Sequence, residues 1–99
     1  MKLSSQLPVP PAAQANKNAI ELLRAWVVNN GLQCSVRVGN GEDEPLLWGV
    51  LISDVARHVA DALNKQSGIS QKDVLDRIRE VFNDELDAPT AATSGSFTQ

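Results

Sequence analysis

The run "AIELLRAWVVNNGLQCSVRV", residues 19–38, decides the fold class of this chain. Between Leu32 and Val38, apolar residues alternate with polar ones, which is typical of a strand with one buried face. The Asn30-Gly31 pair just before this strand is a strong hairpin-turn signal. We therefore predict a β-hairpin with strands over 19–28 and 32–38. A helix over 19–28 is the alternative, because Ala, Glu, Leu and Arg also favour helix.

The turn leaves two registers open. A two-residue turn at 30–31 pairs Val27 with Cys34. A three-residue turn with a bulge pairs Val28 with Leu32. The first register places on the core face Leu23, Ala25 and Val27. The second places there Leu22, Trp26 and Val28.

Strand 19–28 carries apolar residues on both faces, whereas the reverse face of strand 32–38 is polar. A two-stranded sheet is marginal by itself, so the second apolar face needs a cover. We expect a second copy of the chain to supply it, as a homodimer. The N-terminal arm and another protein partner are the alternatives. The candidate interface residues are Ile20, Leu22, Trp26 and Val28.

Two amphipathic helices are predicted after the hairpin. The first runs from about 44 to 65, with Pro45 in its first turn and a Ser-Gly pair after its end. Ser70 opens the second in a capping-box-like spacing with Asp73, and this helix should end before Pro89. Their apolar stripes are Trp48, Leu51, Ile52, Val55, Val59, Ala62 and Leu63, and then Val74, Leu75, Ile78, Val81, Phe82 and Leu86. The predicted fold is α+β, a β-hairpin packed on an antiparallel helix pair in the order ββαα.

We expect a single domain over residues 19–88. Residues 1–18 are rich in Pro, Ala, Gln and Asn without an apolar period, and they predict an extended arm. Residues 89–99 have the small polar composition of a flexible tail.

The composition argues against several classes of partner. The net charge is −3 and Lys and Arg never form a run, so nucleic-acid binding is not expected. No apolar stretch approaches the ~20 residues that span a bilayer, and the first residues lack the apolar core of a secretory signal. A single cysteine, Cys34, cannot form an intramolecular disulfide, which fits a reducing cytoplasm. We expect a cytoplasmic protein that binds neither nucleic acid nor membrane.

The candidate ligand-binding residues lie mostly on the first helix. Asp54, Arg57, His58 and Asp61 fall within an arc of about 100° when successive residues turn by ~100°. Two carboxylates beside His58 suit a proton donor or an anion pocket. The competing interpretation is a solvated helix face with i,i+3 and i,i+4 ion pairs. On the second helix, Glu85 either reaches water at the helix end or bridges to Arg57 or His58.

No catalytic residue, cofactor or metal site is predicted. One His and one Cys cannot form a zinc site without two further carboxylates. Cys34 alternates inward with its apolar neighbours, so we expect a buried, inert thiol.

Three segments, ELLRAWVVNNGL, WGVLISDVARHVADAL and IREVFNDELDAPT, resemble a family of small bacterial proteins of unknown function. Trp48-Gly49 and the set Asp54, Arg57 and His58 carry the resemblance, which covers about residues 19–90. It implies one uncharacterised domain and supplies no reaction or cofactor.

The leading hypothesis is a small acidic, non-enzymatic interaction module that self-associates through the uncovered side of the sheet. The alternative is a small-ligand-binding protein or an enzyme that uses Asp54, Arg57 and His58.

Overall fold

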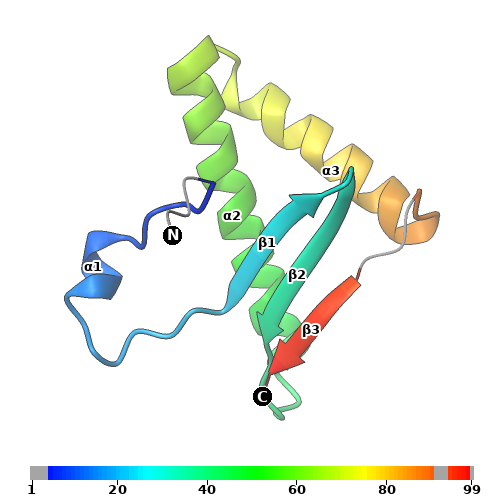
Figure 1. The fold of residues 1–99 in the computed structure, drawn as a ribbon. Helices are drawn as coiled ribbons and strands as arrows, with labels where there is room; N and C mark the ends of the chain where they lie inside the picture. The colour runs from blue at the N-terminus through cyan, green and yellow to red at the C-terminus, as the bar shows by residue number, and fades with distance from the viewer. Residues whose placement is uncertain (1–4, 91–93, 99) are drawn as a thin grey trace.

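The computed structural model describes residues 5–90 and 94–98. Its elements are α1 (Pro11–Gln14), β1 (Leu23–Val28), β2 (Gly31–Arg37), α2 (Glu44–Ser67), α3 (Gln71–Asp87) and β3 (Ser94–Thr98). Figure 1 shows β1 and β2 crossing in front of the lower part of α2, β3 beside β2, and α3 running away from the C-terminal end of α2. The α+β fold, a hairpin followed by two helices, is confirmed.

The first strand is a strand and not a helix, but it begins at Leu23. It pairs antiparallel with β2. The paired positions near the turn are Ala25 with Cys34, Trp26 with Gln33, Val27 with Leu32, and Val28 with Gly31. The turn residues are therefore Asn29 and Asn30, whose φ angles are 51° and 66°. Both predicted registers are therefore wrong. Positive φ at both turn positions is the geometry of a type I′ turn, and asparagine tolerates positive φ well enough to take the place of glycine.

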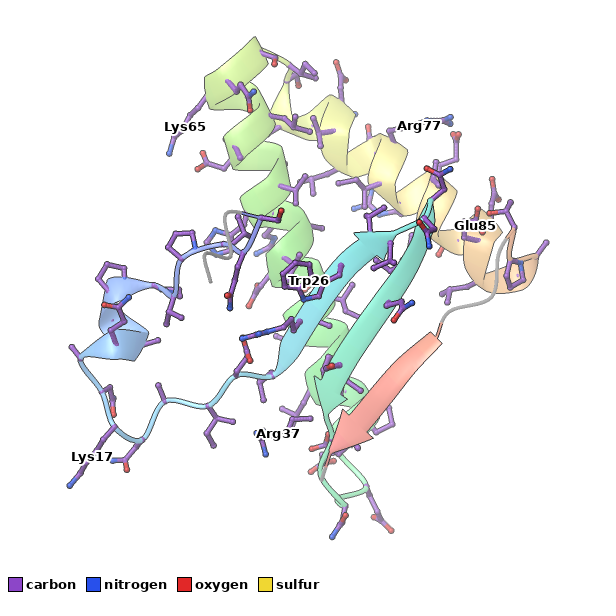
Figure 2. All side chains as sticks on the ribbon, viewed as in Figure 1. Lys17, Trp26, Arg37, Lys65, Arg77 and Glu85 are labelled. Carbon is purple, nitrogen blue, oxygen red and sulfur yellow. The ribbon has the colours of Figure 1, made fainter. Side chains whose placement is uncertain are left out.

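The observed register gives the hairpin one wholly apolar face. Because side chains alternate along a strand, that face carries Leu23, Ala25, Val27, Leu32, Cys34 and Val36. The predicted two-residue turn at 30–31, although wrong in register, places the same three β1 residues, Leu23, Ala25 and Val27, on one face. Trp26, labelled in Figure 2, lies on the opposite face with Gln33 of β2 and is half-buried. Cys34 is also half-buried and not fully buried as expected.

The ends of the helices follow the local signals closely. α2 begins at Glu44 with Pro45 in its first turn, and Gly68 ends it with a φ of 73°. The Gly68 N–H donates to the Asn64 carbonyl at 2.8 Å. Ser70 Oγ accepts a hydrogen bond from the Asp73 backbone N–H at 3.3 Å, as the capping spacing predicts.

Both terminal segments contain structure that their composition does not predict. One turn of helix, α1, interrupts the expected extended arm, because Pro11 suits a first helical position. In the expected flexible tail, β3 pairs parallel with β2, with Cys34 opposite Gly95 and Val36 opposite Phe97. Pairing on a strand edge uses backbone groups, so small polar residues do not prevent it.

The core of the described chain is small. α2 and α3 pack on each other near their connection and diverge from there (Figure 1). Ala60 on α2 and Val74 on α3 are the buried hydrophobic residues of the described part. Large parts of both predicted stripes are exposed, including Ile52, Val55 and Phe82. The single chain therefore leaves much of its apolar surface in water.

Candidate functional site: an apolar groove beside helix α2

A groove of about 630 Å³ lies between α2 and the ends of the hairpin. Its walls are mostly apolar, with a few polar side chains, which is the usual composition of a ligand site. The apolar lining consists of Ile20, Leu22, Val38, Leu47, Trp48, Val50, Leu51 and Val55. The polar lining consists of Arg37, Glu44, Asp54 and His58. The groove brings two of the predicted site residues, Asp54 and His58, to one wall.

Asp54 and His58 stand one helical turn apart, at the i,i+4 spacing that puts side chains on one helix face. The sequence pattern anticipated this part of the geometry. Whether the pair binds a ligand stays a prediction.

Glu44 and Trp48 form the polar end of the groove. The Trp48 indole Nε1 donates to Glu44 Oε2 at 3.1 Å, again across one turn of α2. Gly39 makes room for this carboxylate, because an added Cβ would lie 2.6 Å from Glu44 Oε1. Trp48 is half-buried, so its ring supplies groove wall and its N–H finds the partner that a partly buried indole needs.

Arg37 closes the groove from the sheet side. Its backbone N–H donates to the Leu22 carbonyl at 2.9 Å, and its side-chain Nε donates to the Glu21 carbonyl at 3.3 Å. These bonds hold the last residue of β2 against the segment before β1. Figure 2 shows Arg37 at this end of the sheet.

The other two members of the predicted cluster lie elsewhere. Arg57 lines a second groove of about 320 Å³ between α2 and α3, together with Arg79 and Phe82. Asp61 accepts from Lys65 Nζ at 2.8 Å, an exposed i,i+4 ion pair. Arg57 is at one edge of the arc and faces α3. Asp61 lies inside the arc, but it is seven residues, or about 10 Å, beyond Asp54 along the helix, and the groove lining ends at His58.

Glu85 has a local role at the end of α3. Its carboxylate accepts from the Thr90 backbone N–H at 2.9 Å and from Thr90 Oγ1 at 2.8 Å. The backbone hydrogen bond, followed by the hydroxyl bond, lowers the pKa of Glu85 below its ordinary value. Within residues 5–90, no ion pair joins it to Arg57 or His58. Figure 2 places it at the end of α3 remote from Lys65 and the helix connection.

The candidate interface residues divide between two surroundings. Ile20 and Leu22 are exposed and line the groove. Trp26 is half-buried and Val28 is exposed, both on the face of β1 opposite the apolar face. Their role in an interface stays a prediction.

In the part of the chain that the structure describes, no group of three or more His, Cys, Asp or Glu side chains is arranged to hold a metal ion. No helix among those residues is long and apolar enough to cross a membrane.

Sequence reasoning did not assign Arg37, Glu44 or Trp48 to the groove. The i,i+4 spacing of Glu44 and Trp48 was available as a signal for their contact. The position of Arg37 was not, because it depends on how the hairpin meets α2.

Comparison with known proteins gives a family and a fold. The family "Domain of unknown function (DUF5076)" matches residues 6–90. A similar solved structure is that of "a putative pyruvate dehydrogenase from the photosynthetic bacterium Rhodopseudomonas palustrus CGA009". It shares 36% sequence identity and a TM-score of 0.69, and the match covers 95% of each chain. No curated protein matches the chain. The expected resemblance to a single domain of unknown function is confirmed.

Proposed function

The chain belongs to the DUF5076 family, and we propose that it is a non-enzymatic interaction module that associates with a second copy of itself. One observation carries the proposal. The chain exposes 8504 Å², whereas a compact monomer of its mass, 10.7 kDa, exposes about 5500 Å².

The excess of roughly 3000 Å² is well above the ~800 Å² that each partner buries in a standard interface. The radius of gyration is 15.4 Å, compared with about 13 Å for a compact domain of this length. Exposed apolar side chains occur on the hairpin, on α2 and on α3, so the terminal arm does not account for the excess alone. A homodimer would place these surfaces against one another.

Light scattering behind size-exclusion chromatography tests this proposal over a wide concentration range. We expect a mass of twice the 10.7 kDa chain, falling toward the chain mass only at high dilution. A monomer at every concentration would contradict self-association.

A second candidate function is binding of a small organic acid in the groove. Its volume of about 630 Å³ lies within the roughly 300–1,000 Å³ range of small-molecule sites. Arg37 and His58 on its lining offer hydrogen-bond donors for a carboxylate. The name of the Rhodopseudomonas protein makes pyruvate the first probe to try.

Trp48 in the groove wall is a built-in reporter of such binding, once Trp26 is replaced by Phe to remove its signal. We expect saturable changes in Trp48 fluorescence with pyruvate, and their loss in Arg37→Ala. Unchanged fluorescence would contradict binding of this acid in the groove.

A further inference from the structure

A segment near the start of α2, residues 46–52, is apolar around the whole circumference of the helix. Apart from the indole N–H of Trp48, its side chains are all apolar, and it covers about two helical turns. A helix that is apolar all round is normally buried on every side. The groove beside the hairpin half-covers Trp48 and Leu51, but Leu46 is 64% exposed and Val50 is 52% exposed.

Gly49 lies on the same side of α2, since positions 46, 49 and 50 share one helix face. A glycine inside a helix weakens it relative to alanine, so its presence needs a packing reason. The described residues supply none, because a Cβ added at Gly49 would meet none of their atoms within 4 Å. A second helix passing close to this backbone would supply the reason.

The space for such a helix adjoins Gly49. The groove of about 320 Å³ between α2 and α3 is lined by Gly49 and Ile52 on α2 and by Phe82 on α3. Ile52 and Phe82 are themselves exposed. An apolar side chain from a second copy would cover both.

We propose that α2 of a second copy packs antiparallel against α2 across Gly49 and Val50, so that Leu46 of each chain enters the other's groove between α2 and α3. This inference rests on the proposed self-association and names its surface. A two-fold axis makes the contact reciprocal, as expected for a dimer.

The charges around the proposed crossing fit an antiparallel arrangement. Arg57 lies seven residues after Val50, and Asp43 lies seven residues before it, at the N-terminus of α2. Because the two residues are equally far from Val50 in sequence, an antiparallel pair of helices that crosses at Val50 places Arg57 beside the partner's Asp43. Within residues 5–90, neither side chain forms an ion pair in its own chain.

The test compares dimer dissociation constants from light scattering and sedimentation for the full chain and its variants. Gly49→Ala should favour the isolated helix, yet we expect it to raise the dissociation constant at least tenfold, because the new methyl group meets the partner helix. Asn83→Ala, on the exposed face of α3, is the matched control and should leave the constant unchanged.

A charge exchange keeps the proposal falsifiable if Gly49→Ala disturbs the fold. Arg57→Glu should raise the dissociation constant at least tenfold by placing like charges together. Adding Asp43→Lys should restore it to within about threefold of the original value, since the opposite charges face each other again. Absence of this rescue would overturn the proposed pairing.

A direct geometric test uses a disulfide near the two-fold axis. In a Cys34→Ser background, Val50→Cys should oxidise to a covalent dimer, and Asn83→Cys should not. A wild-type monomer overturns both this inference and the proposed function. A wild-type dimer that is unaffected by Gly49→Ala and Arg57→Glu overturns this inference alone and leaves self-association standing.

Discussion

Replacing Gly68 by alanine should lower the free energy of unfolding, because Gly68 ends α2 and begins the connection to α3. Gly68 adopts a φ of 73°, in the left-handed region that an L-residue enters only at a cost. A Cβ there would meet no atom of residues 5–90 or 94–98 within 4 Å, so no steric clash with them adds to the conformational cost.

The size of the effect follows from two opposing contributions. The left-handed conformation costs a residue with a side chain about 1–2 kcal/mol. Alanine also restricts the unfolded chain, which returns roughly 0.4–1 kcal/mol. The expected net loss is about 1 kcal/mol in the free energy of unfolding, or a fall of roughly 4–8 °C in Tm for a domain of this length.

Urea denaturation at one fixed chain concentration measures this loss, since self-association would make stability depend on concentration. Gly41→Ala is the matched control. Gly41 has no left-handed φ, and its added Cβ would lie 3.8 Å from the Asp43 nitrogen, an ordinary contact. Equal losses for the two variants would refute the assignment of the cost to the Gly68 backbone.

Three further changes test other parts of the fold. Asn30→Val should lower the free energy of unfolding by about 1–3 kcal/mol, because a β-branched residue is strained at positive φ. Asn30→Gly should be tolerated. Equal thermal stability of the two variants would contradict the observed turn. Ser70→Ala removes the oxygen that accepts the Asp73 N–H and should cost about 1 kcal/mol in urea denaturation; no loss would mean that water replaces this cap without cost. Thr90→Val removes one donor to Glu85 and should raise the pKa of that carboxyl toward its ordinary value, as measured by NMR titration. Because the folded pKa is lowered, the stabilisation by Glu85 is present above its unfolded pKa and is lost as the pH falls through the folded value. A titration of Glu85 that Thr90→Val leaves unchanged would contradict the hydrogen bond from the Thr90 hydroxyl.

Local patterns predicted the elements of this fold because local physics sets them. Alternation in 32–38 and the Ser70 cap depend on residues only a few positions apart, and both predictions are confirmed. The hairpin register was predicted incorrectly. Asn29-Asn30 and Asn30-Gly31 are both acceptable turn pairs, and only the pairing of the complete strands selects between them.

The candidate site was predicted in part for a similar reason. Helical spacing alone puts Asp54 and His58 on one face, and the structure places both in the groove. The same spacing cannot say that Arg57 belongs to the α3 side or that Arg37 completes the groove. Those placements depend on the directions in which α3 and the hairpin leave α2.

The sequence by itself determined the hairpin followed by two helices, the helix ends, and the presence of apolar residues on both faces of the first strand. These features depend on backbone preferences and on periodicity within one element. Only the tertiary structure decided the separation of Arg57 from His58, the pairing of β3 with β2, and the open space at Gly49. Each of these depends on contacts between residues far apart in the chain, where packing geometry and not local preference selects the neighbour.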